Sequence, residues 1–285
     1  MSSNGVVAVV GAGSMGRAIL AGVVAAAGAD VEVRVTTATH AGAARVALSS
    51  GVTIRDLESE PDANRIAVRG AALVVVAVKP SRVREVLAEV RDDLAPDAVV
   101  VSVAAGVSLA TLARALPASV AVVRAMPNTP AAIAKGVTGL AGDERVTDAQ
   151  WDLVRRVFES VGIVVMVDES RLDTLGTLSG SGPAYFYLVV EQMTRAACAL
   201  GFSLEEASRL VTRTFVGAAS LLEFTGATPA ELRRQVTSPR GTTERAIAVL
   251  DDAHLDQLIV RACEAALARS RELAAEAEAE GGGRG

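Results

Sequence analysis

The chain has 285 residues, 51% of them hydrophobic and only 3% aromatic, so it has room for about two domains with cores of Ala, Val and Leu. Its 33 acidic and 28 basic residues give a net charge of −5 without a long run of either sign, which argues against nucleic acid or an anionic membrane as a partner. The long uncharged run Ala98–Ala113 contains Ser, Gly and Thr and falls short of the roughly 18 apolar residues of a spanning helix. Without a basic n-region, a CxxC motif or a Cys/His cluster, we expect a cytoplasmic protein with reduced thiols and no metal site.

The first part of the chain alternates short β-branched runs with helical patterns. Strands are predicted at Val6–Val10, Val31–Thr36, Leu73–Val78, Ala98–Val103, Val120–Arg124, Val137–Ala141 and Ile163–Val167. Helices are predicted at Met15–Ala27, Ala41–Ser50, Ser81–Asp93, Leu109–Leu116 and Asp148–Val161. Because several strands are continuous Val/Ala runs, helices should cover both of their faces. The alternation therefore predicts an N-terminal Rossmann-type, doubly wound α/β sheet.

The pattern changes near Asp168, after which no convincing strand follows. Helices are predicted at Pro183–Leu200, Leu204–Phe224, Pro229–Val236, Thr243–Leu250 and Leu255–Ala279. We therefore expect a dinucleotide-binding domain over residues 1–168 and an all-α domain over residues 169–285. A helical part in that position is expected to supply the substrate wall, the oligomer interface, or both.

Three glycines follow the first predicted strand directly, in "VVAVVGAGSMGRAIL". Gly11 permits the tight turn, Gly13 lets the backbone approach a pyrophosphate, and Gly16 lets helix and strand pack closely. Amide groups at the start of the next helix then face the phosphates. Strand, motif and helix in this order predict a dinucleotide site.

The residues about 20 positions after the motif indicate which dinucleotide is preferred. An NAD enzyme typically has Asp or Glu there, whereas this chain has Thr36, Thr37, Thr39 and His40. Hydroxyl groups bind a 2′-phosphate without the repulsion of a carboxylate. The sequence therefore predicts NADP(H), with NAD(H) as the weaker cofactor. The alternative is that Thr39 and His40 only begin a helix.

Two further segments follow predicted strands, at the edge where open α/β sheets bind ligands. "AVKP" ends in Lys79 and Pro80, and "RAMPNTP" carries Asn128, a short polar group suited to a nicotinamide. The plainer interpretations are a solvated loop lysine and a crossover turn. A turn at Ser179–Pro183, "SGSGP", is expected either to approach a ligand through its backbone or only to break a helix.

The stretch "TSPRGTT" precedes a helix predicted to begin near Thr243. Backbone N–H groups at a helix start suit a carboxylate, and Ser238 adds a hydroxyl donor. Thr242 or Thr243 has an alternative role as the N-cap of that helix, which contributes ~1 kcal/mol. On this loop alone, capping is the simpler interpretation.

Together these segments resemble the pyrroline-5-carboxylate reductase family. The matching stretches are "VGAGSMG" at 10–16, "AVKP" at 77–80, "AAGVSL" at 104–109, "RAMPNTP" at 124–130, "LSGSGPAYF" at 178–186, "TSPRGTT" at 237–243 and "RSREL" at 269–273. They run in family order across almost the whole chain, and "SGSGPAY" together with "SPxGTT" is specific to this family among Rossmann-type reductases. The resemblance implies NAD(P)H-dependent reduction of 1-pyrroline-5-carboxylate to L-proline, the last step of proline biosynthesis. It also implies an interlocked homodimer, larger assemblies of dimers, and active sites shared between subunits.

The resemblance also carries site residues onto this chain, with Thr243 expected to orient the ring nitrogen of the substrate. The residues expected to bind substrate are Ser181, Ser238, Gly241, Thr242 and Thr243. Those expected to bind the cofactor are Gly11, Ala12, Gly13, Ser14, Met15, Gly16, Thr36, Thr37, Asn64, Ala77, Val78, Lys79, Pro80, Ala104, Ala105, Gly106 and Asn128. A bound iminium needs no enzyme acid, whereas a neutral imine needs Thr243 to relay a proton from water, and the sequence leaves both open.

One residue departs from the family pattern, because "SPGGTT" becomes "SPRGTT" here. If the replaced glycine needs a positive φ, Arg240 is strained; otherwise it points to solvent or adds a cation near the substrate carboxylate, which is the interpretation we favour. A 3-hydroxyacid dehydrogenase is disfavoured, because it needs a lysine acid/base in the helix that reads "YFYLVVEQMTRAACAL" here. A reductase of a six-membered cyclic imine and a non-catalytic NADP(H)-binding protein stay open.

Overall fold

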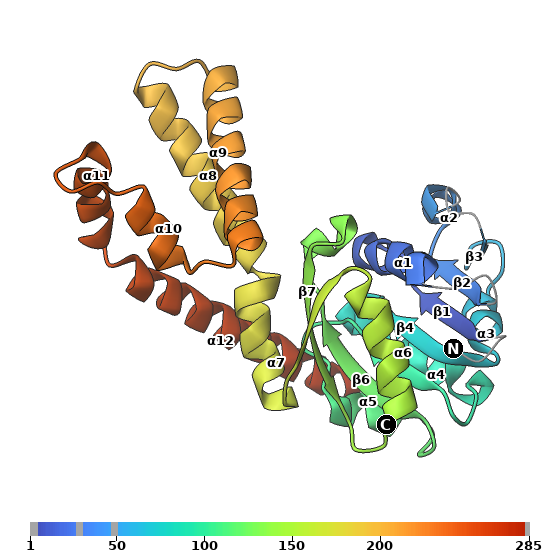
Figure 1. Ribbon diagram of the computed structural model, residues 1–285. Helices are drawn as coiled ribbons and strands as arrows, with labels where there is room; N and C mark the ends of the chain where they lie inside the picture. The colour runs from blue at the N-terminus through green and yellow to red at the C-terminus, as the bar shows by residue number, and fades with distance from the viewer. Residues whose placement is uncertain (1–4, 27–30, 47–50, 283–285) are drawn as a thin grey trace. The chain divides into compact units, whose positions relative to one another are not determined.

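The computed structural model describes residues 5–26, 31–46 and 51–282. The chain divides into two compact units, of which the first comprises residues 1–181 and 265–285 and the second comprises residues 182–264 (Figure 1). The last residues of two predicted helices, Ala27 and residues 47–50, lie outside the described ranges.

The first unit is built on an eight-stranded sheet in the order β3-β2-β1-β4-β5-β6-β7-β8. Its strands are β1 (Val6–Val10), β2 (Glu32–Thr37), β3 (Val52–Asp56), β4 (Ala71–Val76), β5 (Val99–Ser102), β6 (Ala121–Met126), β7 (Gly136–Gly142) and β8 (Gly162–Met166). The first six strands are parallel. β7 pairs antiparallel with β6, and β8 pairs parallel with β7. The Rossmann-type sheet predicted from the sequence is confirmed.

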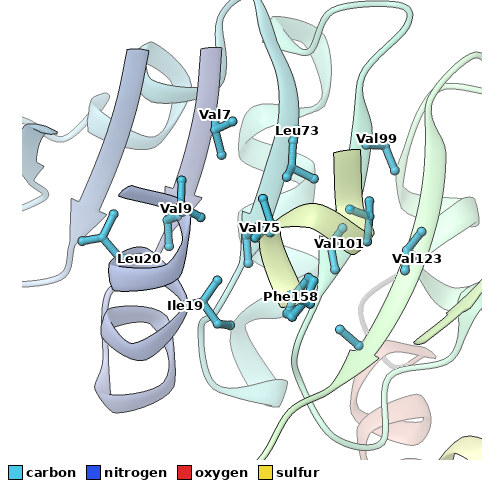
Figure 2. Packing of buried hydrophobic residues seen from close by; sticks show 14 of the residues in the cluster. Val7, Val9, Ile19, Leu20, Leu73, Val75, Val99, Val101, Val123 and Phe158 are labelled. Atoms are coloured by element: carbon cyan, nitrogen blue, oxygen red, sulfur yellow. The ribbon is translucent and has the colours of Figure 1, made fainter. Parts of the chain in front are cut away.

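Helices cover both faces of this sheet, as the uninterrupted Val/Ala strands require. They are α1 (Ser14–Ala26), α2 (His40–Val46), α3 (Ala63–Val68), α4 (Val83–Val90), α5 (Leu109–Ala115), α6 (Asp148–Glu159) and α7 (Glu169–Leu175). Alternate strand residues face opposite sides: Val9 and Val75 pack with Ile19 of α1 and Phe158 of α6 (Figure 2). The residues between them pack with α4 and α5 in a second buried cluster.

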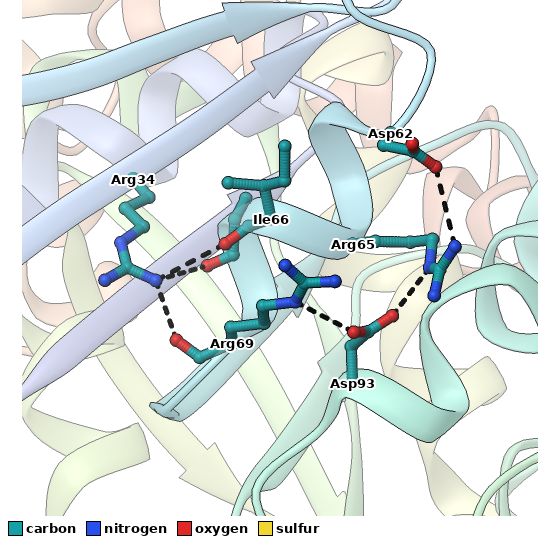
Figure 3. A network of polar contacts seen from close by, with 7 residues as sticks. Arg34, Asp62, Arg65, Ile66, Arg69 and Asp93 are labelled. Carbon is teal, nitrogen blue, oxygen red and sulfur yellow. Dashed lines mark hydrogen bonds and ion pairs between the residues drawn. The ribbon is translucent and has the colours of Figure 1, made fainter.

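The sequence pattern does not predict β3 or α3. α3 has only six residues, and Asp62, at its N-cap, makes no side-chain capping bond. Its C-terminal carbonyl groups are instead satisfied from a distance, because the Arg34 guanidinium on β2 donates to the carbonyl oxygens of Ile66, Ala67 and Arg69 (Figure 3). A helix whose end is completed by another strand leaves no local capping signal in its own sequence.

The second unit contains only helices among its described elements. They are α8 (Gly182–Ala199), α9 (Leu204–Thr225), α10 (Pro229–Gln235), α11 (Thr242–Asp251) and the first part of α12 (Leu255–Gly282). α9 and α10 begin with capping boxes at Ser203 and Thr228, and α9 ends on Gly226 at φ 61°. None of the helices in the described ranges combines the length and apolarity needed to cross a membrane.

The predicted turn at Ser179–Pro183 is shorter than expected, because only Ser181, a bend, separates two helical segments. A single π-helical turn, Gly176–Gly180, follows α7, and α8 begins at Gly182. Pro183 is tolerated because it lies in the first turn of α8, where a missing N–H group leaves no hydrogen bond unmade.

Candidate active site

The three glycines after β1 meet three different requirements. Gly11 has φ 89°, and a Cβ there would lie 2.5 Å from Cγ1 of Val78. A Cβ on Gly16 would lie 2.6 Å from the carbonyl oxygen of Gly11, so α1 packs against the turn only without a side chain. A Cβ on Gly13 would meet nothing within 4 Å, and its φ is not positive. Neither packing nor backbone conformation demands Gly13, whereas close approach of a pyrophosphate does, so this turn fits a dinucleotide.

The residues predicted to bind the cofactor all lie in the first unit, around the carboxyl ends of parallel strands. Gly11–Gly16 follow β1, Thr36 and Thr37 end β2, Ala77–Pro80 follow β4, and Ala104–Gly106 follow β5. Asn64 lies on α3, and Asn128 follows β6. Such an edge is where open α/β sheets bind their ligands. The segments that the sequence predicts for cofactor binding therefore lie at one edge of the sheet.

Thr36, Asn64 and Glu89 form a chain of hydrogen bonds behind the glycine turn. The Gly11 N–H donates to Oγ1 of Thr36 at 3.2 Å, and that hydroxyl donates to Oδ1 of Asn64 at 2.7 Å. Nδ2 of Asn64 donates to Oε2 of Glu89 on α4 at 3.0 Å. Thr36 and Asn64 are each 1% exposed. Both predicted cofactor residues are therefore already bonded within the protein.

α3, which carries Asn64, is held at several points (Figure 3). Besides the bonds from Arg34, Arg65 and Arg69 donate from Nε to the two carboxylate oxygens of Asp93, at 2.6 and 2.9 Å. Hydrogen bonds from these two guanidinium groups lower the pKa of Asp93 below its ordinary 3.8. The position of Asn64 is thus fixed by contacts from β2 and from the short 3-10 turn Arg91–Asp93 that follows α4.

β3 places two carboxylates beside the start of α2 that sequence reasoning missed. Oε2 of Glu58 accepts the His40 N–H at 2.7 Å, and Oδ2 of Asp56 lies 3.4 Å from Nδ1 of His40. The N–H of Ser59 is the main cause of the lowered pKa of Asp56. The absence of a carboxylate at the end of β2 is real, but the neighbouring strand supplies two nearby. Recognising Val52–Asp56 as a strand would have revealed them.

Arg124 and Asn128, from "RAMPNTP", fasten α7 and the π-helical turn to the sheet. The Arg124 side chain is 5% exposed and donates to Glu169 and Asp173 of α7, at 2.9 Å each. Nδ2 of Asn128 donates to the carbonyl oxygen of Ser179 at 2.9 Å, and Oδ1 accepts the Val137 N–H at 2.8 Å. One N–H of the Asn128 carboxamide remains for a ligand.

The segment "TSPRGTT" lies in the second unit, and there the expected threonine cap is wrong. The N-cap of α11 is Gly241, which has no side chain to cap with, and Thr242 is the first helical residue. Within the described residues, the hydroxyl groups of Thr242 and Thr243 have no hydrogen-bond partner. Arg240 has φ 62°, the left-handed conformation, and its N–H donates to Oε2 of Glu244 at 2.9 Å. The favoured interpretation, that this position accepts a side chain without strain, is therefore wrong: the backbone adopts the left-handed geometry that glycine reaches easily.

Residues 169–273 match the family model described as pyrroline-5-carboxylate reductase dimerisation, and residues 6–106 match one described as NADP oxidoreductase coenzyme F420-dependent. A pyrroline-5-carboxylate reductase of Pseudomonas aeruginosa is 39% identical to this chain, over 94% of this chain and 96% of the relative. The chain belongs to the pyrroline-5-carboxylate reductase family. A solved pyrroline-5-carboxylate reductase from Coxiella burnetii is 35% identical, covers 96% of this chain and 99% of its own, and has a TM-score of 0.86. The Plasmodium falciparum pyrroline carboxylate reductase with NADP bound, 23% identical over 95% of this chain and 99% of its own, shares the fold with a TM-score of 0.79.

Membership of the pyrroline-5-carboxylate reductase family gives the helices of the second unit a role. The dimerisation model covers α7 to α11 and most of α12. Large apolar side chains are about half exposed on α8 and α9, among them Leu188, Val189, Leu210, Val216 and Leu221. Exposed apolar surface of this kind is typical of a protein–protein interface. The chain therefore carries a dimerisation domain.

Proposed function

We propose that this protein reduces 1-pyrroline-5-carboxylate to L-proline, with NADPH as its preferred cofactor and NADH as the weaker one. The observation that carries the proposal is family membership along 94% of the chain. The glycine turn and the "SPRGTT" segment supply the two half-sites that the reaction needs. Thr36 and Thr37, in place of a carboxylate at the end of β2, support the NADPH preference.

The cofactor half-site consists of the segments around the sheet edge. Gly11–Gly16 admit the pyrophosphate, the buried Thr36, Thr37 and Asn64 form the floor beneath the adenosine ribose, and Ala77–Pro80 and Ala104–Gly106 complete the edge with Asn128. A bound dihydronicotinamide supplies the hydride. Residues 1–168 act as the dinucleotide-binding domain in this proposal, and residues 169–285 as the substrate-binding and dimerisation domain.

The substrate half-site consists of the start of α11 and the loop before it. The backbone N–H groups of Thr242 and Thr243 with the Ser238 hydroxyl suit the substrate carboxylate, because a helix start carries partial positive charge. Gly241 begins this helix start as its N-cap, and its own N–H is bonded to the Ser238 carbonyl oxygen at 2.9 Å. The unbonded hydroxyl of Thr243 hydrogen-bonds and orients the ring nitrogen. Ser181 adds a polar group at the start of α8. These residues accelerate the reaction by holding the substrate in a geometry for attack.

The protein acts as a cytoplasmic homodimer in this proposal, and dimers assemble further. The exposed apolar side chains of α8 and α9 support the dimer. In this proposal each active site lies between one subunit's nucleotide domain and the partner's helices. A reductase of a six-membered cyclic imine is the alternative enzyme, and a non-catalytic NADP(H)-binding protein is the alternative of another class.

The first test follows the oxidation of NADPH by the purified protein with pyrroline-5-carboxylate, beside NADH and a six-membered cyclic imine. We expect turnover that prefers the five-membered ring and NADPH. Comparable Michaelis constants for NADH and NADPH would contradict the cofactor preference. Detectable NADPH binding without turnover of either imine would favour the non-catalytic protein.

The role of Thr243 is tested by Thr243→Ala, with Thr243→Ser as the matched control. Loss of a hydrogen bond to a charged or developing-charge group costs about 1.5–3 kcal/mol, so kcat should fall roughly 10- to 100-fold. The dissociation constant of NADPH should not change, and serine should restore most of the rate. Unchanged turnover in Thr243→Ala would refute the role.

A further inference from the structure

The hydrogen bonds behind the glycine turn have a fixed direction, and Glu89 fixes it. A carboxylate only accepts hydrogen bonds, so Asn64 must present Nδ2 to Glu89 and Oδ1 to Thr36. Oδ1 only accepts, so the Thr36 hydroxyl must donate its one hydrogen to it. Oγ1 of Thr36 is then left with lone pairs, one of which accepts the Gly11 N–H.

This chain of bonds lies where a dinucleotide-binding sheet reads the adenosine ribose. Thr36 is the residue 20 positions after Gly16 and ends β2, the place where NAD enzymes carry an acidic residue that binds the ribose 2′-hydroxyl. In this chain the acidic residue is Glu89 on α4, which is separated from Thr36 by the side chain of Asn64. With its side chain buried and its hydrogen committed to Asn64, Thr36 offers no donor to a 2′-phosphate that would offset the charge of Glu89.

The charged groups around Glu89 do not neutralise its carboxylate. Arg82 is a cation close enough to interact with Glu89, but its guanidinium is bonded to Glu85 at 2.9 Å. On the side of β3, Asp56 and Glu58 add negative charge near the start of α2. A phosphate at the end of β2 therefore meets carboxylates from two directions, and Glu89 is the one linked to Thr36 by hydrogen bonds.

We propose that Glu89 determines cofactor specificity: its negative charge, held behind Thr36 by the hydrogen bonds through Asn64, lowers the affinity for a 2′-phosphate relative to a 2′-hydroxyl. This inference rests on the proposed function to the extent that the protein binds NAD(P)H. Glu89 thus limits the preference for NADPH that the absence of a carboxylate at the end of β2 favours. It acts on binding and takes no part in hydride transfer.

Glu89→Gln tests the proposal in the full-length protein. The glutamine retains an acceptor for Nδ2 of Asn64 and removes the charge. Dissociation constants for NADPH and NADH are measured by fluorescence titration without substrate. The preference for NADPH, expressed as the ratio of the two constants, should rise about fivefold, the order expected of one unit charge acting on a phosphate across an intervening side chain. Raising the ionic strength should shrink this difference.

Two control variants keep the outcome clear. Asp92→Asn removes an exposed carboxylate just after the same helix that is paired with Arg91 and not bonded to Asn64, and Glu89→Asp retains the charge; both should leave the ratio within about twofold of the wild type. A ratio unchanged in Glu89→Gln, or shifted equally by Asp92→Asn, would overturn the role of Glu89. A protein that binds both dinucleotides but reduces no imine would overturn the proposed function. The ratio of the NADH and NADPH dissociation constants is measured without substrate, so it would still test the role of Glu89.

Discussion

Replacement of Arg240 by glycine should stabilise the protein. Arg240 has φ 62°, and a non-glycine residue pays about 1–2 kcal/mol in the left-handed region. Glycine removes that strain but loses about 0.5–1 kcal/mol through the greater freedom of the unfolded chain. The bond from the residue 240 N–H to Glu244 survives the change. The free energy of unfolding should therefore rise by about 0.5–1 kcal/mol.

Urea unfolding followed by far-UV circular dichroism measures this change. Fluorescence is less suitable, because the one tryptophan, Trp151, lies on α6 in the first unit whereas Arg240 lies in the second. All variants are compared at one protein concentration, since dimerisation contributes to apparent stability. Ala134→Gly, at φ 56°, should gain a similar amount.

Arg240→Ala separates strain from charge, because alanine keeps the left-handed strain and removes the guanidinium. It should gain no stability, and neither variant should change the Michaelis constant for the imine, since the Arg240 side chain is exposed. Destabilisation by Arg240→Gly, or an equal gain in Arg240→Ala, would refute the reasoning. A higher Michaelis constant in both variants would show that the cation assists substrate binding.

Three further predictions test other contacts. Asn128→Asp should raise the NADPH dissociation constant and lower kcat several-fold, because a carboxylate donates neither to the Ser179 carbonyl nor to a bound nicotinamide; an unchanged dissociation constant would remove Asn128 from the cofactor half-site. Gly13→Ala should raise the NADPH dissociation constant and leave the free energy of unfolding in urea nearly unchanged, whereas Gly16→Ala should lower the free energy of unfolding by about 1–3 kcal/mol. A stability loss in Gly13→Ala but not in Gly16→Ala would contradict the packing argument. Asp93→Asn should destabilise the protein at pH 7. Because folding lowers the pKa of Asp93, its ion pairs stabilise the folded state fully above pH 3.8, and this stabilisation is lost as the pH falls through the lowered pKa. In urea unfolding, the difference in unfolding free energy between wild type and variant should therefore shrink below pH 3.8. A difference that does not change with pH would contradict this role of Asp93.

The sequence predicts the sheet well where each strand carries its own signal. Val6–Val10 and Ala71–Val76 are buried on both faces, and such strands need only apolar residues in a short run. The glycine turn is also predictable from its own motif, because side chains at Gly11 and Gly16 would collide with Val78 and with the carbonyl oxygen of Gly11. The cofactor edge of the sheet was therefore predictable.

The parts that the sequence did not predict depend on contacts between distant residues. α3 is completed by Arg34 from β2, so its own six residues carry no capping pattern. The π-helical turn at Gly176–Gly180 is held by Asn128, which is 51 residues before Ser179 in sequence. Local preferences of Ser, Gly and Pro indicate a turn there, and the tertiary bond overrides them.

The division of the chain has a consequence for its synthesis. The first unit is completed by residues 265–285, and Gly106 lies 3.6 Å, measured from the Cβ it would carry, from Ala274 of α12. A ribosome adds roughly 5–20 residues per second, so the nucleotide sheet waits several seconds after its last strand, β8, for α12 to arrive. During that interval the surface around Gly106 lacks its cover. The order of translation therefore makes the helical unit available for folding and pairing before the nucleotide unit is finished.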